Sequence, residues 1–483
     1  MARRRWFPAL AVGLVLVLTA AAAPGCGGGS GPTSAEPPAT DTDGSAPPPP
    51  EPTCPVDALE PLTAPVAITA WASVIGDGRA ALDLVVARYN AAQTRVRVTV
   101  AEAPADPVAQ RGLYALAAAS GELPALVALD TTITQYLIDT GTVIAASDCR
   151  KADGSPDNSL PVVRNATTTG DTHWAGSASP ETDVLFYRRD AFAAAGLDPD
   201  SPPRSLAELE ADARKLKDAG APTPPIALAG DSSLVENWLT GVGVDIVDHA
   251  NGHQKHATES TFDNPRTLEL YTWVQRMTRA GLLAIEPATA GQEPAAAPVA
   301  RLQHAAMTVA TSTLIGSIAA ATAAPMPDVD VGPFPGIDAA GRGKVEGLAW
   351  YPTTTGSATV RAAAWDFLIF LNTPPSQVTM NLTGSYLPDN IRATDDPALE
   401  AMWTGTRRGR WLDTAYTQLT NLDPAIPGPL IGPYDETRAA IRASLEAVAA
   451  GAPPADAIAT ANRAINEALA DYRPDRPDRP DRP

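Results

Sequence analysis

Residues 66–71, Val-Ala-Ile-Thr-Ala-Trp, open the part of the sequence that decides the fold class. This run is apolar and partly β-branched, which predicts a buried strand. Apolar residues then recur at the i, i+3, i+4, i+7 spacing of an amphipathic helix: Leu82, Val85, Val86 and Tyr89. Alternating valines predict a second strand over 96–100, a helix follows over 108–120, and a third strand is predicted over 125–129. Strands that alternate with helices in this way predict a parallel sheet covered on both faces, which is an α/β fold.

Helix start signals and apolar stripes continue along the chain. Ser205 and Glu208 form a capping box, and Asn264-Pro265 combines a cap residue with proline at the first turn. Two more helices are predicted around 365–369 and 458–469. The folded body of about 420 residues is too large for one sheet, so we expect two lobes.

The N-terminus carries an export signal. Arg3-Arg4-Arg5 precede an apolar stretch over 9–23, and Pro24-Gly25 breaks it before Cys26. A cysteine after small residues is typical of a bacterial lipoprotein, so residues 1–25 are interpreted as a signal peptide and Cys26 as the lipidated residue that anchors the chain to the outer face of the cell membrane. The alternative is ordinary cleavage after Ala23 and secretion.

Both ends of the mature chain are expected to be unstructured. Residues 26–58 are mostly Gly, Pro, Ser, Thr and acidic residues, which predicts a tether. Residues 471–483 contain an Arg-Pro-Asp repeat and are predicted to be a disordered tail.

Two cysteines remain once Cys26 is lipidated. Cys54 and Cys149 would lie in an oxidising compartment, where an even remainder predicts one disulfide. Two free thiols are the alternative.

Composition and charge exclude some classes of protein. Hydrophobic residues make up 45% of the 483 residues, which is too many for a disordered chain. The formal net charge is −19, and no cluster of Lys and Arg is visible beyond Arg3-Arg4-Arg5 of the export signal, so we expect no nucleic-acid partner.

Several segments, in the expected order, resemble the extracellular solute-binding proteins of bacterial ABC importers, in the branch that includes carbohydrate binders. The most specific match is residues 183–192, Asp-Val-Leu-Phe-Tyr-Arg-Arg-Asp-Ala-Phe. The other matching segments are residues 66–71, 89–90, 124–130, 195–197, 202–209, 261–265, 305–307 and 384–388.

The resemblance implies a periplasmic-binding-protein-like fold of two lobes, with strands that cross the hinge between them. The expected lobes are residues 59–170 with 297–348, and residues 171–296 with 349–470. A sugar or oligosaccharide would be bound in the cleft by hinge closure and passed to the permease of an ABC transporter, with no cofactor and no catalysis. We expect a monomer.

Trp71 and Asp130 are candidates because ligands of open α/β sheets lie beyond the carboxyl ends of strands. The resemblance implies a second crossover between the lobes at Glu346 and Trp350. Aromatic rings could stack on sugar faces, with Trp350 as the main platform, and polar side chains could bond sugar hydroxyls. The aromatic candidates are Trp71, Trp238, Trp350 and Tyr386. The polar candidates are Ser73, Asp130, Thr131, Asp231, Glu236 and Glu346. The alternatives are core packing for Trp71 and helix capping for Asp130 and for the segment that contains Asp231, Glu236 and Trp238.

Other functions have weaker support. His249, His253 and His256 have a spacing that zinc could use, but they lie in an expected turn, and we predict no metal site. No G-x-S-x-G motif is present, and no catalytic residue is assigned. A glycoside hydrolase or esterase of the cell envelope, and a lipoprotein that senses a ligand without transport, remain alternatives.

Overall fold

The computed structural model describes residues 54–60, 64–74, 76–288, 293–322, 328–339 and 341–473. All of them lie in the second of the two units into which the chain divides, Glu51–Pro483. The expected signal peptide, Cys26, most of the tether and most of the C-terminal tail therefore lie outside the described residues. None of the helices within these ranges is long and apolar enough to cross a membrane.

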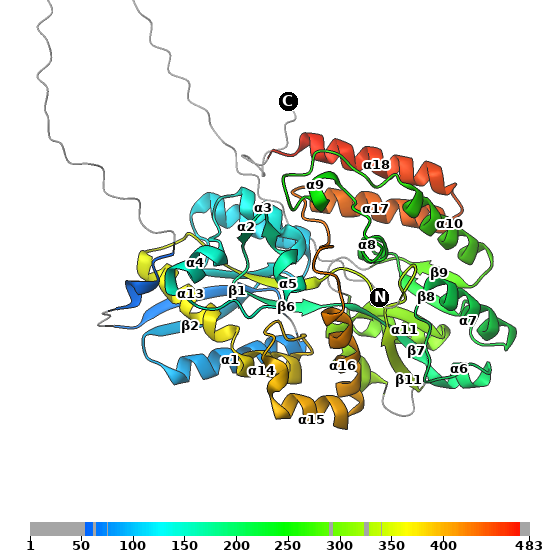
Figure 1. Ribbon diagram of the computed structural model, residues 1–483, viewed down its shortest axis with the longest axis horizontal. Coiled ribbons are helices and arrows are strands. Elements are labelled where there is room, and N and C mark those ends of the chain that lie inside the picture. Colours follow the sequence, from blue (N-terminus) through cyan, green and yellow to red (C-terminus); the bar gives the residue numbers. More distant parts are fainter. Residues whose placement is uncertain are drawn as a thin grey trace, which may run out of the picture. The chain divides into compact units, whose positions relative to one another are not determined.

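Two five-stranded sheets form the framework (Figure 1). In order across the first sheet, the strands are β2 (Val96–Glu102), β1 (Val66–Ala72), β3 (Leu126–Asp130), β12 (Glu346–Pro352) and β6 (Ser177–Glu181). In order across the second, they are β11 (Val329–Pro333), β7 (Asp183–Arg188), β10 (Met307–Thr311), β8 (Ile226–Ala229) and β9 (Leu283–Glu286). The pair β4 (Thr168–Thr169) and β5 (Thr172–His173) stands apart. β1 runs parallel to β2 and β3, as the sequence predicts.

The chain passes from the first sheet to the second within one residue. β6 ends at Glu181 and β7 begins at Asp183, so Thr182 is the crossing point. Backbone N–H of Thr182 donates to Ser312 Oγ (3.2 Å), and N–H of Ser312 donates to the Thr182 carbonyl (2.8 Å). A second crossing leads from β11 back to β12, which lies between β3 and β6 and antiparallel to both. The chain thus crosses between lobes more than once, as expected.

Both faces of the first sheet are covered, which explains the apolar run of β3. Leu126 and Ala128 face one core, and Val127 and Leu129 face the other. One core contains α1 (Gly76–Ala92), α13 (Ala358–Leu371) and α14 (Pro374–Gly384). The other contains α2 (Pro107–Ser120) and α3 (Thr134–Asp139), which follows the turn η2 (Thr131–Ile133).

The second sheet is covered in the same way. Along β7, Leu185 and Tyr187 face one core, and Val184 and Phe186 face the other. The helices of the first of these cores are α6 (Arg189–Ala194), α7 (Leu206–Asp218), α8 (Ser232–Thr240), α10 (Pro265–Arg279), α17 (Tyr434–Ala449) and α18 (Pro454–Asp471). Those of the second are α5 (Pro161–Ala166), α11 (Ala296–His304), α12 (Ile315–Ala321), α15 (Pro397–Gly405) and α16 (Arg407–Thr420). The remaining short elements are η1 (Val56–Leu59), α4 (Ala146–Asp153), α9 (Asp248–Asn251), η3 (Ser312–Leu314) and η4 (Ala393–Asp395).

The predicted helix starts are confirmed at the level of their caps. Ser205 Oγ accepts from N–H of Glu208 (3.3 Å) at the start of α7. Asn264 Oδ1 accepts from N–H of Arg266 (2.9 Å) and Thr267 (3.0 Å) at the start of α10. Because these caps satisfy N–H groups that have no partner inside the helix, each stabilises its helix by about 1 kcal/mol.

The sheets divide the chain differently from the expected lobe boundaries. Residues 297–348, expected with the first lobe, supply β10 and β11 to the second sheet. Residues 349–371, expected with the second lobe, form most of β12 and all of α13, which pack in the first. The reason is strand pairing: β7 takes β10 and β11 as antiparallel neighbours on either side.

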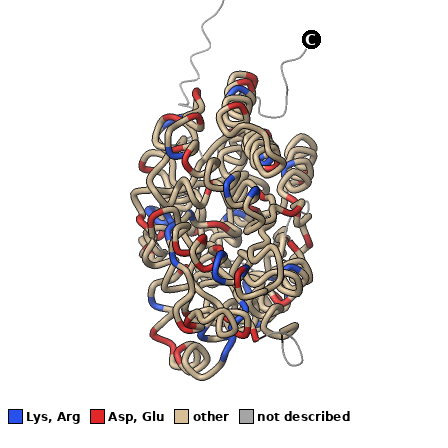
Figure 2. The backbone as a smooth tube through the Cα atoms, turned by 90° about the vertical axis from the view of Figure 1, so that its right-hand side faces the viewer, with Lys and Arg blue, Asp and Glu red and all other residues tan. Residues whose placement is uncertain are grey.

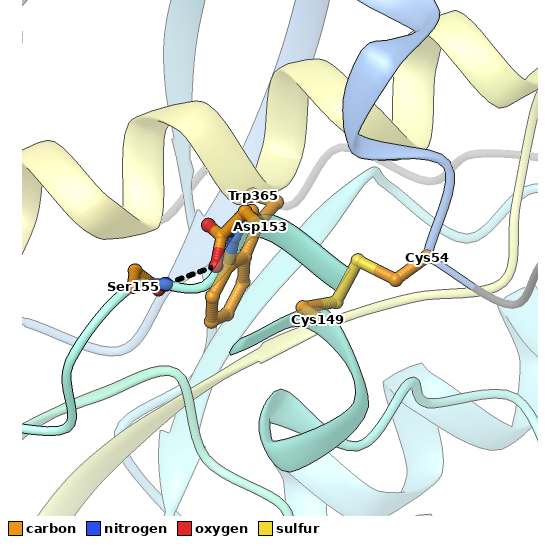
Figure 3. The surroundings of a disulfide bond; sticks show 5 residues. All are labelled: Cys54, Cys149, Asp153, Ser155 and Trp365. Atoms are coloured by element: carbon orange, nitrogen blue, oxygen red, sulfur yellow. Dashed lines mark hydrogen bonds between the residues drawn. A yellow bond between two sulfur atoms is a disulfide. The ribbon is translucent and has the colours of Figure 1, made fainter. Parts of the chain in front are cut away.

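The disulfide between Cys54 and Cys149 is confirmed, with a Cα–Cα distance of 5.1 Å (Figure 3). Cys149 lies on α4, whose last residue, Asp153, accepts from Trp365 Nε1 (2.6 Å) of α13. The bond therefore fixes the end of the expected tether to the first lobe, and residues 54–58, expected to belong to the tether, include the disulfide and most of η1. At the other end, Tyr472 of the expected tail is bonded through its hydroxyl to Asp139 Oδ2 (2.7 Å).

We predict that replacing both cysteines, Cys54→Ser with Cys149→Ser, lowers the free energy of unfolding by about 2–5 kcal/mol, because the bond closes a long loop in the unfolded chain. The sequence separation of 95 residues places the expected loss toward the upper end of that range. Urea unfolding of the variant and of the reduced wild-type protein measures the loss, and the two should agree. Equal stability of oxidised wild type and variant would contradict the prediction.

Candidate functional site

A cavity of about 640 Å³ opens where strands of both sheets end or begin. The end of β3 contributes to it from the first sheet, and the ends of β8 and β10 contribute from the second. Its volume is in the range of small-molecule sites, ~300–1,000 Å³. The carboxylates that line it are Asp77, Asp106, Asp130, Glu181, Asp183, Asp231, Glu293, Glu346 and Asp435. The basic residues that line it are Lys344, Arg438 and Arg442.

Asp130 stands at the end of β3, where the chain turns into η2 and α3. Its Oδ1 accepts from N–H (2.9 Å) and from the hydroxyl (2.6 Å) of Thr132. Its own N–H donates to Gln110 Oε1 of α2 (2.9 Å). Asp130 therefore caps the helical turn that follows it and also lines the cavity. Helix capping and ligand contact are compatible roles for this residue.

The same strand-to-helix turn recurs in the second sheet. Asp231 follows β8, and its Oδ1 accepts from N–H of Ser233 (2.9 Å) at the start of α8. Thr311 ends β10, and its Oγ1 accepts from N–H of Thr313 (3.5 Å) at the start of η3. Because each of these strands ends at the cavity, the polar residue that stops the strand and starts the helix also lines the site.

A buried ion cluster lies beside the cavity. Glu236 of α8 is fully buried and accepts from Arg438 Nε (3.1 Å) and the Tyr434 hydroxyl (2.8 Å) of α17. Lys344 Nζ lies 3.3 Å from Glu236 and 2.5 Å from Glu346 Oε1. The cluster therefore ties α8 and α17 to the start of β12.

The charges of this cluster are held by one another. Burial alone would raise the pKa of Glu236, but Arg438 and Lys344 outweigh it and lower that pKa to about 2. Burial would likewise lower the pKa of Lys344, but Glu346, Tyr434 and Glu236 raise it above its ordinary value. Both ions stay charged at neutral pH, and removing either would leave the other buried without its partner.

Glu181 and Asp183, on either side of the crossing residue Thr182, are in a different situation. Burial raises the pKa of Glu181, and the nearby Glu346 raises it further, to about 7. Burial and Glu346 also raise the pKa of Asp183 well above its ordinary value. Glu346 is the residue paired with Glu181 across β12 and β6, so the register itself places like charges side by side.

Half of the binding residues predicted from the sequence line this cavity. They are Asp130, Thr131, Asp231, Glu346 and Tyr386. Contact of these five with a ligand stays a prediction.

The expected aromatic platform is not in the cavity, and the prediction for Trp350 is wrong. Trp350 is 1% exposed and packs in the core of the first sheet, edge to face with Phe367 at 6.2 Å between ring centroids. Trp238 is fully buried in the second sheet's core beside Trp273, and its Nε1 donates to the Pro335 carbonyl (3.0 Å). Both rings therefore pack in the cores of the two sheets and do not line the cavity.

The other three predicted residues also lie away from the cavity lining. Trp71 is half-buried at the margin of the core that α2 and α3 form. Ser73 is buried, and its hydroxyl donates to the Ala128 carbonyl (3.4 Å). Glu236 is buried in the ion cluster, so it acts on the cavity only through Lys344 and Arg438.

The sequence patterns do not single out the residues at the crossing. Glu181 and Asp183 come before the apolar run of β7, whereas the search rule looks beyond the carboxyl ends of strands. Two acidic residues around one threonine, directly before a buried strand, are the signal that could have identified them. Arg438 carries no local signal, because its partners Glu236 and Glu346 are distant in sequence. Lys344 lies two positions from Glu346, but its second partner, Glu236, is distant.

Two of the three histidines considered for zinc lie at hydrogen-bond distance from other groups. His253 Nδ1 and Nε2 each lie 2.8 Å from a backbone carbonyl, those of Thr168 and Gly428. His256 Nε2 lies 2.7 Å from Asp139 Oδ1. In the described ranges, no group of three or more His, Cys, Asp or Glu is arranged to hold a metal ion.

Charged residues elsewhere on the chain are mixed. In the view of Figure 2, Lys and Arg positions lie among Asp and Glu positions rather than on one basic face.

Comparison with known proteins finds a family and several relatives. The model of the bacterial extracellular solute-binding protein family matches residues 72–378. The sn-glycerol-3-phosphate-binding periplasmic protein UgpB of Yersinia pseudotuberculosis is 25% identical over 223 residues, which cover 44% of this chain and 49% of that protein. The chain thus spans about half the length of the first curated relatives it matches.

Solved structures show the same two-lobed fold. The cyclic alpha-maltosyl-1,6-maltose binding protein of Arthrobacter globiformis has a TM-score of 0.69 and 21% identity, and the match covers 84% of this chain and 99% of that one. UgpB of Mycobacterium tuberculosis, in complex with glycerophosphocholine, has a TM-score of 0.67 and 20% identity, with 85% and 99% covered.

We predict that Glu181→Gln stabilises the ligand-free protein at pH 8 by about 2 kcal/mol. A carboxyl whose pKa is raised by folding takes up its proton first in the folded state, so the wild type gains stability as the pH falls from 8 toward 5. The advantage of the variant should therefore shrink to below about 1 kcal/mol near pH 5. Urea unfolding at both pH values measures it, with the exposed Glu467→Gln as control, and a variant less stable than wild type at pH 8 would contradict the prediction.

Proposed function

Since the chain belongs to the family of bacterial extracellular solute-binding proteins, we propose that it is the solute-binding component of an ABC importer. It holds a sugar or oligosaccharide in the cavity between its two sheets and releases it to the permease. The observation that carries this proposal is the cavity itself, which takes strand ends from both sheets and is lined by side chains that bond hydroxyl groups.

The polar lining suits a hydroxyl-rich solute. Carboxylates such as those of Asp130 and Asp231 accept hydrogen bonds from sugar hydroxyls, and threonine hydroxyls can donate or accept. Relatives support the class of ligand: the similar structures include proteins that bind a maltosyl oligosaccharide and glycerophosphocholine. Both are small, polar and rich in hydroxyl or ester oxygens.

Hinge closure completes the proposed mechanism. The two sheets are joined by short crossings, at Thr182 and before β12, about which they could rotate. Arg111 of α2 pairs with Asp435 (3.2 Å) and Glu436 (3.3 Å) of α17, so ion pairs connect the helices of one sheet with those of the other at the cavity. A ligand that touches both walls favours the closed form by its extra contacts there.

The location follows from the family and the N-terminal signal. We propose that the protein acts outside the cytoplasm as a monomer, held at the cell membrane by a diacylglyceryl and palmitate anchor on Cys26. The permease partner binds the closed, loaded form. No chemical step is part of this proposal, so the bound solute should be recovered unchanged.

We predict that Asp130→Ala weakens sugar binding at least about tenfold, because it removes a charged acceptor from the cavity wall. A thermal-shift screen of mono- and oligosaccharides on the wild type identifies the ligand, and isothermal titration calorimetry compares the variant. Silence across the sugar panel would contradict the proposed ligand class.

Asp396→Ala is the matched control, because it removes the same kind of helix cap outside the cavity: Asp396 Oδ1 accepts from N–H of Ala398 (2.9 Å) at the start of α15. Both variants should lose about 1 kcal/mol of stability. Equal affinities in the two would show that Asp130 acts only as a cap. Detection of hydrolysed sugar would favour the hydrolase alternative.

We predict that Cys26→Ala moves the protein from the membrane fraction to the soluble fraction and abolishes labelling with palmitate in the native host. One acyl signal gives marginal binding and two give stable anchoring, so the loss should be nearly complete. Unchanged fractionation would contradict lipidation at Cys26.

A further inference from the structure

The cavity is strongly acidic for a site that must hold a solute: nine carboxylates line it against three basic groups. Acidic residues alone do not define a ligand, because helix caps and ion pairs use many of them. What matters is which carboxylates are already satisfied by the protein, and which are left for a ligand to satisfy.

Seven of the nine carboxylates are stabilised by the protein itself, through an ion pair, a backbone N–H group or a helix dipole. Three pair with basic groups: Glu346 with Lys344, Asp435 with Arg111, and Glu293 with Arg301. Three more accept from backbone N–H at helix or turn starts: Asp106, Asp130 and Asp231. Asp77 is exposed in the first turn of α1, where the helix dipole favours a negative charge.

The remaining two, Glu181 and Asp183, have neutral partners. Thr311 and Thr313 hydroxyls bond Glu181, and Asn237 Nδ2 donates to Asp183 Oδ2 (3.1 Å). The charge of Lys344 lowers the pKa of Asp183, although burial and Glu346 outweigh it. Lys344 Nζ forms its ion pairs with Glu236 and Glu346. Within the described ranges, neither carboxylate forms an ion pair with Lys or Arg.

Both carboxylates line the cavity and are separated in sequence only by Thr182. Glu346 is paired with Glu181 across the β12–β6 ladder, and its charge also raises the pKa of Asp183. Like charges this close repel each other, and burial removes the water that would screen them. A positively charged group placed between them would relieve both costs, and the three donors of an ammonium group could bond carboxylate oxygens, each of which can accept more than one hydrogen bond.

The rest of the lining fits hydroxyl groups better than aromatic stacking. Six hydroxyl-bearing residues line the cavity, and Tyr386 is the one aromatic among the described lining residues. The six are Thr131, Thr132, Ser233, Thr311, Thr313 and Ser317. A sugar in this site is therefore held mainly by hydrogen bonds and charge.

An anionic solute is the competing reading, since one named relative binds sn-glycerol-3-phosphate. Lys344 and Arg438 are occupied by Glu236 and Glu346. Arg442 lines the cavity with a buried Nε that has no hydrogen-bond partner, so it is the group that could bind a phosphate. A phosphate bound to Arg442 would be repelled by the carboxylates that line the same cavity.

Resting on the proposed function, we propose that the solute of this cavity is an amine-bearing sugar, whose ammonium group binds between Glu181 and Asp183 while its hydroxyls bond the threonine and serine side chains. The proposal sets this chain apart from a binder of neutral maltosyl sugars or of glycerol phosphates, and it follows from the charges at the crossing rather than from the relatives.

The test measures affinity by isothermal titration calorimetry on the intact chain in detergent at pH 8. The probes are matched pairs, each an amino sugar and its N-acetyl derivative, from one to three residues long and based on glucosamine, galactosamine and mannosamine; maltotriose and sn-glycerol-3-phosphate complete the panel. At least one amine form should bind at least about tenfold more tightly than its N-acetyl form. Glu181→Gln and Asp183→Asn should reduce that ratio to below about threefold, and Glu467→Gln should leave it unchanged.

Each other outcome counts against the inference. Equal or tighter binding of an N-acetyl form or of maltotriose would overturn it and leave the proposed sugar-binding function standing. Binding of sn-glycerol-3-phosphate that Arg442→Gln abolishes would assign an anionic ligand. Silence of the whole panel would contradict the proposed function together with the inference. Melting curves check that each variant folds, and Glu181→Gln carries the test if Asp183→Asn does not fold.

Discussion

The position of β12 is the constraint on which the site depends. The chain arrives from the second sheet and inserts this strand between β3 and β6, antiparallel to both. The register pairs Leu348 with Asp130 on one side and Glu346 with Glu181 on the other. One strand thereby brings the end of β3, the end of β6 and the crossing into the second sheet to a single edge, where the cavity lies. A shift of the register would turn every side chain of β12 to the opposite face and separate these groups.

The electrostatics of the site follow from this geometry. The cluster of Glu236, Lys344, Glu346 and Arg438 balances its own charges and keeps them ionised. Because Lys344 and Arg438 pair with Glu236 and Glu346, neither forms an ion pair with Glu181 or Asp183. These two carboxylates are buried near Glu346. In the absence of a ligand, protonation relieves this repulsion, as the raised pKa of Glu181, about 7, indicates. The site is therefore built at some cost to stability, a cost that a bound cation would offset.

The sequence predicts the elements well and the site only in part, for a physical reason. Strands, helix stripes and caps depend on neighbours a few positions away, so β1 to β3, α7 and α10 are confirmed. Asp130 and Asp231 each follow a strand and cap the next helix, and both features depend on nearby sequence. Such a residue lies at the carboxyl edge of its sheet, and the cavity lies at this edge. Trp350 was expected to face the ligand, but its side depends on the pairing of β12 with two distant strands, and both faces of that sheet are covered. Lys344 and Arg438 both gain their roles from Glu236, a partner that only the fold brings near.

The central claim is that a solute binds between the two sheets at the crossing. A crystal structure of the protein with the tightest-binding sugar of the panel tests it most directly. The account predicts density for the sugar in the cavity, with one polar group within hydrogen-bond distance of Glu181 or Asp183 and others near Asp130 and Thr311. Density for the sugar on any other surface, with the cavity unoccupied, would contradict it.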